Sequence, residues 1–178
     1  MSAASIVIVD HDERWGEAFA SAAADLGVVL EPWVVDIEHV GSTSVPGLAA
    51  KPVIDIQVGV TSLEASARIV AAVERLGYVY VPELERDLPK RRFFRRVSSA
   101  GRSTHHVHLV ERTDHEWWHR HIRFRDWLRT HPDDRDRYAA LKRSLAAEYR
   151  DGKEGYTEAK TAFIAGIVEH ATTTCPDE

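Results

Sequence analysis

The sequence predicts an α/β protein, built of alternating strands and helices in its N-terminal two-thirds and of helices alone in its C-terminal third. Up to Glu111, short runs rich in β-branched residues alternate with stretches whose apolar residues recur at helical spacing. After Glu111 only the helical spacing continues. We therefore expect a β/α part at about 5–111 and a helical part at about 114–171, packed together as a single domain within residues 1–178.

The N-terminal part is expected to contain four strands, each marked by consecutive β-branched or aromatic residues, at 6–9, 33–39, 51–60 and 78–81. The strand at 51–60 is expected to be central. A helix between the first two strands begins after Asp10 and Glu13, which resemble a capping pair, and ends near Gly27. A second helix, at 62–76, ends before Gly77, and residues 83–89 are expected to form a loop.

Two further runs, at 90–97 and 103–110, are expected to pair as a hairpin with its turn at 98–101. Three helices follow, and Pro132 and Gly155 mark the breaks between them. Each helix has one apolar stripe: Trp117, His121, Phe124 and Leu128 in the first, Tyr138, Leu141, Leu145 and Tyr149 in the second, and Ala159, Phe163, Ile164 and Ile167 in the third.

The composition limits the class of protein. Of the 178 residues, 44% are hydrophobic and 29% are charged, which is typical of globular chains and not of disordered ones. The formal net charge of −5 argues against indiscriminate nucleic-acid binding, and no apolar run reaches membrane-spanning length. The one cysteine, Cys175, allows no disulfide within the chain. We expect a cytoplasmic protein with a small-molecule or nucleotide ligand, and neither nucleic acid nor membrane as a partner.

One stretch, 40–58, combines the elements of a phosphate site. Its Gly41-Ser42-Thr43 turn lets a backbone approach a phosphate closely and directs N–H groups at it. In the strand that follows, alternation places Asp55 and Gln57 on one face and apolar residues on the other. Asp55 could then hold the magnesium that accompanies a nucleotide. The alternative is a tight polar turn, with Asp55 paired to Lys51 or an arginine.

Histidines offer a second set of candidate groups. Alternation places His106 and His108 on one face of the strand at 103–110. Two histidines at this spacing can share a metal, or one can act as a general base. Glu38, just before the turn, is another candidate metal ligand. The alternative is that the histidines face solvent or form structural hydrogen bonds.

The basic strand at 90–97 offers a third set of candidate groups. Arg92 shares one face with Phe94, and Arg91 shares the other with Phe93. If either face lies beside Asp55, its guanidinium groups could bind a triphosphate in bidentate fashion. The alternative is a solvated edge strand whose charges prevent edge-to-edge association.

Five segments resemble the GrpB family, at 39–55, 91–96, 104–110, 124–129 and 156–160. Members of that family are also found fused to bacterial dephospho-CoA kinases. The resemblance implies a nucleotidyltransferase-like mixed β-sheet flanked by helices. In that superfamily a Gly-Ser turn precedes a strand with two acids one residue apart. Gly41 and Ser42 match the turn and Asp55 matches the first acid, but Gln57 stands at the position of the second acid.

These observations lead to one main hypothesis, a nucleotidyltransferase-like enzyme that binds a nucleoside triphosphate with Mg²⁺ or Mn²⁺ and transfers a nucleotidyl group to a small molecule. The residues assigned to it are Asp55, Glu38, His106 and His108 for metal; Asp55, His106 and His108 for catalysis; and Gly41, Ser42, Thr43, Lys51, Arg92 and Lys160 for the nucleotide. The alternative, favoured by Gln57, is a catalytically silent nucleotide- or CoA-binding module or folding partner. A third possibility is that the histidine pair holds a transition metal for hydrolysis.

Overall fold

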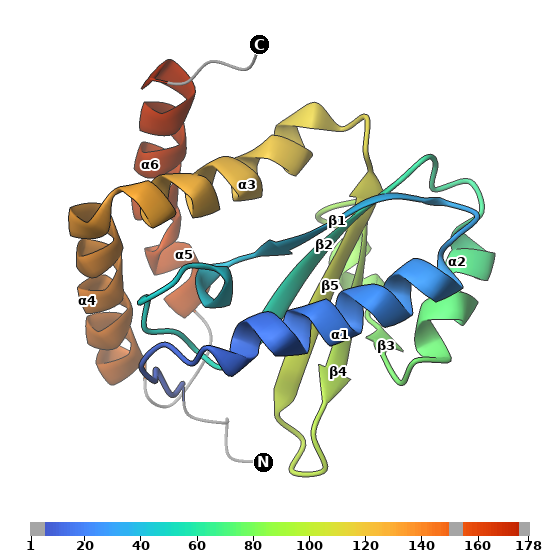
Figure 1. The fold of residues 1–178 in the computed structure, drawn as a ribbon, viewed down its shortest axis with the longest axis horizontal. Coiled ribbons are helices and arrows are strands. Elements are labelled where there is room, and N and C mark those ends of the chain that lie inside the picture. Colours follow the sequence, from blue (N-terminus) through green and yellow to red (C-terminus); the bar gives the residue numbers. More distant parts are fainter. Residues whose placement is uncertain (1–5, 150–154, 175–178) are drawn as a thin grey trace.

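A computed structural model describes residues 6–149 and 155–174 of the chain, so that Cys175 lies outside the described part (Figure 1). The helices in that part are α1 (Arg14–Val29), α2 (Ser66–Glu74), α3 (His115–Thr130), α4 (Pro132–Glu148), α5 (Tyr156–Ala159) and α6 (Thr161–Thr174). The strands are β1 (Val34–Val40), β2 (Ile54–Val60), β3 (Val79–Tyr80), β4 (Arg91–Val97) and β5 (Ser103–Glu111). Two short 3₁₀ helices are η1 (Ser42–Ser44) and η2 (Pro82–Glu85).

The five strands form one mixed sheet in the order β1-β2-β5-β4-β3. Strands β2 and β5 run parallel, and every other neighbouring pair is antiparallel. The hairpin of β4 and β5 is confirmed. The expectation that the strand at 51–60 is central is wrong, because β5 inserts between β2 and β4 and takes the middle of the sheet. The register places Asp55 opposite His106 and Gln57 opposite His108.

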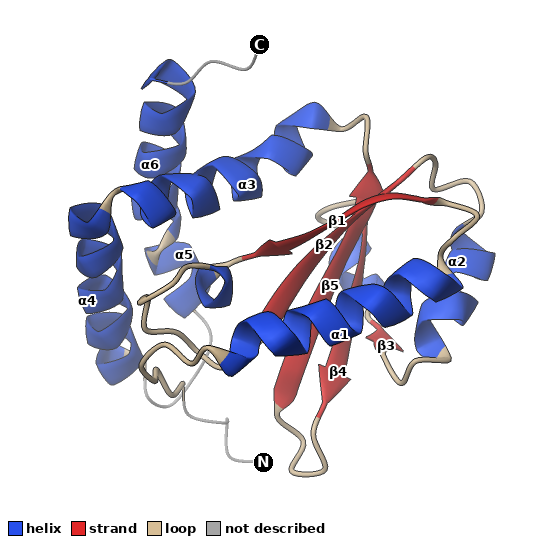
Figure 2. Ribbon diagram, in the orientation of Figure 1, coloured by secondary structure: helices blue, strands red, loops and turns tan. Residues whose placement is uncertain are grey.

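One face of the sheet carries the main apolar core. Helix α1 crosses this face with α2 beside it (Figure 2), and the apolar stripes of both helices pack on the strands. The alternation seen in the sequence accounts for the strand contribution, since Ile54, Ile56 and Val58 of β2 are all in this core. Val107 and Leu109 of β5 and Phe94 of β4 join them. Asp55 and Gln57 of β2, and His106 and His108 of β5, therefore lie on the opposite face.

The helical third packs against that opposite face and the end of the sheet, with α4, α5 and α6 standing together beside it (Figure 1). A second core joins the residues after η1 to these helices: Val45, Leu48 and Ala49 pack with Phe124, Leu128, Tyr138, Ala139 and Ile167. Pro132 occupies the first turn of α4, where its missing N–H costs nothing. No helix in the described residues is long and apolar enough to cross a membrane.

The α+β fold class expected from the sequence is confirmed, although several boundaries differ. The expected strand at 6–9 is reduced to a single antiparallel bridge between Val9 and Ala50. The helix expected from residue 62 begins at Ser66, and part of the expected loop at 83–89 is the short helix η2. The last helix is divided at Lys160 into α5 and α6. Local pattern finds the elements well, but their ends depend on tertiary packing.

Candidate functional site

The polar face of the sheet and the helical third enclose a cavity of about 520 Å³, a volume typical of small-molecule sites. Its wall is formed by the η1 turn, strands β2, β4 and β5, and helices α4 and α5. The lining residues that carry polar or charged groups are Ser42, Thr43, Lys51, Asp55, Arg91, His106, His108, Lys142, Tyr156, Thr157 and Lys160, and the apolar and aromatic ones are Ile6, Val53, Leu84 and Phe93. The sequence thus brings together groups that lie more than 100 residues apart.

The turn after β1 brings backbone directly against the acid of β2. Gly41 has a φ of +71° and a ψ of −173°, a conformation that only glycine adopts readily. A Cβ at this position would lie 3.0 Å from Cβ and Cγ of Asp55 and closer still to its carboxylate. Glycine is therefore required at residue 41 for two reasons, the backbone conformation and the proximity of Asp55. The Gly-Ser turn and the acid form one unit, as the sequence predicts.

Asp55 and His106 form a hydrogen-bonded pair across β2 and β5, with 3.1 Å between Oδ1 and Nδ1. Burial alone would raise the pKa of Asp55, but the hydrogen bond from His106 and the positive charge of Lys160 hold that pKa below its usual value. Because an ionised carboxylate only accepts hydrogen bonds, Nδ1 of His106 must be the donor. The other ring nitrogen, Nε2, is then free to accept a proton, which is the arrangement of a general base.

His108 lies on the same face but has a different partner. Its Nδ1 is 3.2 Å from Nη1 of Arg91, and burial lowers its pKa to about 3. A guanidinium only donates, so Nδ1 of this neutral imidazole accepts and its proton resides on Nε2. The two neighbouring histidines therefore carry opposite tautomers, and only His106 has the form of a base.

Three lysines reach the cavity, from the segment before β2, from α4 and from α5. Lys142 of α4 is only 2% exposed; its Nζ donates to the carbonyl of Ala49 and lies 4.6 Å from the ring of Tyr138. Burial, with the nearby charges of Lys160 and Arg143, lowers the pKa of Lys142 to about 7. Burial also lowers the pKa of Lys160, against the opposite effect of Asp55. Among the described residues that line the cavity, three are lysines and only Asp55 carries a carboxylate, so the lining favours an anionic ligand.

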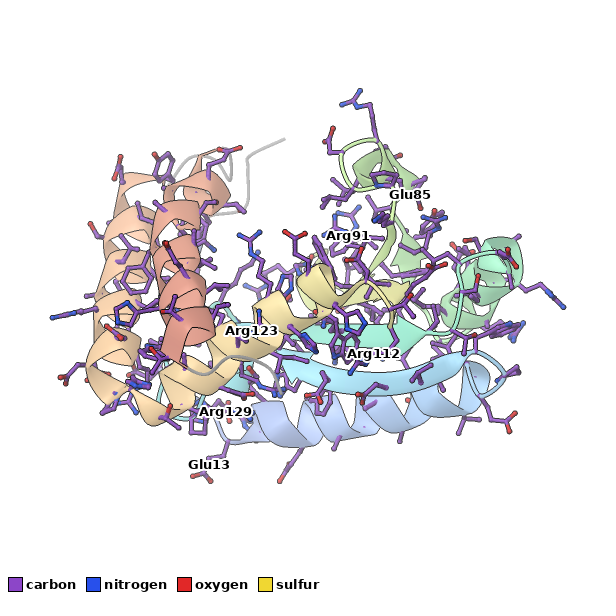
Figure 3. All side chains as sticks on the ribbon, turned by 90° about the horizontal axis from the view of Figure 1, so that it is seen from above. Glu13, Glu85, Arg91, Arg112, Arg123 and Arg129 are labelled. Carbon is purple, nitrogen blue, oxygen red and sulfur yellow. The ribbon has the colours of Figure 1, made fainter. Side chains whose placement is uncertain are left out.

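Two arginines of α3 hold the turn in place from outside the cavity. Arg125 is buried, donates to the carboxylate of Glu38, and also donates to the carbonyl of His39 at 3.0 Å. Arg129, one helical turn further, donates to the carbonyl of Ser44 at 3.1 and 2.9 Å. Figure 3 shows Arg129 near the end of α3. The segment at 124–129, noted in the sequence for its resemblance, thus holds the turn that follows β1 in place.

Thr43 lies at the cavity, yet its hydroxyl is committed to the fold. Its Oγ1 donates to the carbonyl of Val53 at 3.1 Å and contacts Nε2 of His39 at the same distance. His39 itself stacks on Phe19 of α1, with ring centroids 4.6 Å apart. These bonds fix the turn, so the contribution of Thr43 to ligand binding would come from its backbone.

The residues expected to hold a metal are not gathered around one point. Glu38 is bound by Arg125, and Gln57 is fully buried, with its Nε2 donating to the carbonyl of Trp118 at 2.9 Å. Within the described residues, no three His, Cys, Asp or Glu side chains are arranged to hold a metal ion. Of the four residues expected to hold a metal, Asp55, His106 and His108 line the cavity, whereas Glu38 is paired with Arg125. A divalent metal at this cavity stays a prediction.

The structure does not bring Arg92 to the cavity. Its side chain lies on the opposite face of β4, where it donates to Oγ of Ser66 at 3.1 Å and pairs with Glu85 at 3.3 Å. Arg91 is the arginine at the cavity, and Figure 3 shows it near the start of α3. The two adjacent phenylalanines leave the core face of this strand ambiguous in the sequence. Phe94 is the one in the core, which turns Arg91 and Phe93 toward His106 and His108.

Sequence reasoning left Arg91 as the alternative to Arg92, and it missed Lys142, Tyr156 and Thr157 as lining residues. Arg91, Tyr156 and Thr157 lie inside segments that the resemblance had already marked, which was the available signal. For Lys142 the only signal is a charged residue beside the apolar stripe of α4, and such lysines are usually at the surface. Its burial follows from the contact of α4 with the turn after η1, which no local pattern reveals.

The mixed sheet flanked by helices, with a Gly-Ser turn after one strand and an acid on the next, agrees with the nucleotidyltransferase-like fold that the resemblance implies. A likeness of fold alone extends to the GLD-2/RNP-8 complex, with a TM-score of 0.50 and 13% identity over 95% of this chain and 62% of that one. The chain belongs to the GrpB family, whose model, "GrpB protein", matches residues 5–170. The resemblance noted in the sequence is thereby confirmed.

Relatives in the family carry family names and little more. The UPF0157 protein YqkA of Bacillus subtilis is 36% identical over 93% of this chain and 47% of its own length. A dephospho-CoA kinase of Mycolicibacterium paratuberculosis is 31% identical over 94% of this chain and 46% of its own. The chain thus spans about half the length of each. A crystal structure of GrpB from Enterococcus faecalis has a TM-score of 0.86 and 35% identity, covering 94% of this chain and 98% of that one.

Proposed function

We propose that the cavity binds a nucleoside triphosphate and that the protein transfers the nucleotidyl group to a hydroxyl of a small-molecule acceptor. The observation that carries the proposal is the convergence, in one cavity, of the Gly41 turn, three lysines and the Asp55–His106 pair. Lysines suit the phosphates, and the pair suits proton removal from a hydroxyl. The expectation of a cytoplasmic protein stays a prediction.

In this proposal the lysines neutralise charge on the phosphates. Lys142 and Lys160 come from the helical third and Lys51 from the sheet side, so that the phosphates would lie between the two parts of the molecule. Gly41 and Ser42 would approach the phosphates through their backbone N–H groups. The Mg²⁺ or Mn²⁺ expected from the fold would accompany the nucleotide, since Asp55 carries the one carboxylate among the described residues that line the cavity.

His106 would act as the base. Its Nε2 takes the proton of the acceptor hydroxyl while the oxygen attacks the α-phosphorus, and the bond from that phosphorus to the bridging oxygen of pyrophosphate breaks. Asp55 holds the imidazole in the required tautomer and stabilises the imidazolium that forms. The lysines stabilise the charge that develops on the departing pyrophosphate.

Calorimetric titration of ATP, GTP, CTP and UTP tests the binding step, in parallel arms with Mg²⁺ and with EDTA. We expect at least one nucleotide to bind wild type and its affinity to fall by about tenfold or more in Lys142→Met. Arg143→Met is the matched control, because it removes one charge from the adjacent, exposed position of α4. Absence of binding by all four nucleotides, or equal losses in the two variants, would refute the nucleotide site.

A binding module without turnover is the second candidate, and buried Gln57 is the observation that favours it. The neutral amide occupies the position of the second superfamily acid, and the dephospho-CoA kinase relative suggests CoA as a ligand. Pyrophosphate release separates the two candidates. Release by wild type that is lost in His106→Gln supports the transferase. Binding of a nucleotide or CoA without release in the presence of any hydroxyl acceptor supports the module.

A further inference from the structure

The cavity extends beyond the lysines to a second end, formed by Arg91 and Phe93 of β4, His108 of β5, and Leu84 of η2. The phosphate chemistry of the proposed function uses the opposite end, beside the η1 turn and helices α4 and α5. The β4 end has its own charged group and its own aromatic surface, and the proposed reaction leaves both unassigned.

Arg91 is a partly buried guanidinium without an acidic partner in the part of the chain that the structure describes. Its one hydrogen bond there is to Nδ1 of neutral His108, at 3.2 Å, and its Nε is buried without a partner. None of the described residues therefore neutralises its positive charge. A cation kept in this state at a cavity wall is suited to an anionic group of a ligand.

Aromatic rings fix the plane of this guanidinium. Its central carbon lies 5.2 Å from the ring centroid of Phe93 and 5.4 Å from that of Trp117. Such contacts restrict the rotation of the guanidinium and leave its N–H groups available to bind a planar carboxylate or a tetrahedral phosphate. Burial lowers the pKa of Arg91, as expected for a charge without a counterion.

Phe93 connects this end to the reacting group. Its ring centroid lies 5.2 Å from that of His106 and 5.1 Å from that of His108. His108 contacts Arg91, and His106 is the next residue along β5 on the same face, with its Cα about 7 Å from that of His108 by the two-residue repeat of a strand. If Arg91 binds the anionic group of a small molecule, the rest of that molecule would therefore lie along the ring of Phe93, and its far end would reach His106.

We propose that the β4 end is the acceptor subsite, and that Arg91 binds the carboxylate or phosphate of a small molecule whose hydroxyl lies at His106. The proposal rests on the transferase function above and specifies its acceptor class. The acceptor is a small anionic molecule, with its charged group at Arg91 and its reacting hydroxyl at the opposite end, beside His106.

Titrations with sn-glycerol 3-phosphate, 4-hydroxybutyrate and neutral 1,4-butanediol, each with and without the bound nucleotide, test this subsite and distinguish phosphate from carboxylate. We expect at least one anionic probe to bind wild type and the diol not to bind. Affinity for that probe should fall by about tenfold or more in Arg91→Met and partly recover in Arg91→Lys. Arg95→Met is the matched control, because Arg95 lies four residues further along the same face of β4 but is exposed and is not among the residues that line the cavity.

The nucleotide affinity of the Arg91 variant shows which end of the cavity Arg91 belongs to. We expect the nucleotide affinity of Arg91→Met to stay within about twofold of the wild-type value. A loss as large as that of Lys142→Met would overturn the proposal, because Arg91 would then belong to the nucleotide end. If wild type binds a nucleotide but no anionic probe, the acceptor subsite is refuted and the proposed function stands. If probes bind through Arg91 but no nucleotide binds, the anion site stands and the proposed function fails. Thermal unfolding confirms that each variant is folded.

Discussion

Replacing Lys142 with methionine should change how stability depends on pH. In the folded protein the pKa of Lys142 is about 7, because the amine is buried near other cations, and in the unfolded chain it returns to 10.5. Between these values the unfolded chain binds more protons than the folded one, so the free energy of unfolding rises with pH. The penalty for burying the charged amine is complete below pH 7 and disappears above pH 10.5.

The size of this effect follows from the shift. Each pH unit in that window is worth about 1.4 kcal/mol, so between pH 7.5 and 9 the free energy of unfolding of wild type should gain about 2 kcal/mol relative to Lys142→Met. Urea unfolding at pH 7.5, 8.25 and 9 measures the difference, and every other titrating group cancels between the two proteins. Arg143→Met should follow wild type. Parallel pH profiles of wild type and Lys142→Met would refute a strongly shifted, buried amine.

The same amine predicts a proton signature of binding. At pH 8 Lys142 is mostly neutral, and a phosphate beside it would raise its pKa and draw in a proton. Nucleotide binding measured in two buffers of different ionisation enthalpy should therefore show an uptake approaching about one proton at pH 8 in wild type. Lys142→Met should show none. Equal uptake in the two proteins would assign the proton to another group.

Three further substitutions test the site. Gly41→Ala should destabilise the fold by about 3 kcal/mol or more in urea unfolding, because its Cβ would collide with Asp55 in addition to straining the backbone. Gly77 also has a positive φ but has open space around it, so Gly77→Ala should cost about 1–2 kcal/mol. Equal costs for the two variants would contradict the close approach of Gly41 to Asp55. Arg125→Met should cost about 3 kcal/mol, since Glu38 and a buried carbonyl lose their partner, and the exposed Arg120→Met should change little. Asp55→Asn should slow pyrophosphate release by about 100-fold or more with nucleotide binding retained, and an unchanged rate would exclude the pair from catalysis.

Strand alternation was enough to predict which side chains share a face. The grouping of Asp55 with Gln57, and of His106 with His108, follows from a period of two, and the register of β2 on β5 then puts the two sets side by side. The parallel pairing itself could not be predicted, because the two strands are about 50 residues apart and no turn connects them directly.

The errors at the site have physical reasons. Arg91 and Arg92 are chemically equivalent in the sequence, and only the packing of Phe94 into the core decides which one faces the cavity. Gln57 is polar and was expected to face outward with Asp55, but Trp118 of α3 covers it and takes its hydrogen bond. Gly59 permits this cover, since a Cβ there would lie 2.9 Å from the Trp118 ring. Such tertiary contacts have no local signature.

The hydrogen bond from Lys142 to the carbonyl of Ala49 crosses the boundary between the helical third and the β/α part. Because the cavity has walls from both, its shape exists only while the two parts are docked. A bound anion would then contact the helical third and the β/α part at once. Filling the cavity should therefore make the two parts unfold more as one cooperative unit. Binding of an anion in the cavity would thus control how cooperatively the protein unfolds, in addition to the chemistry of the site.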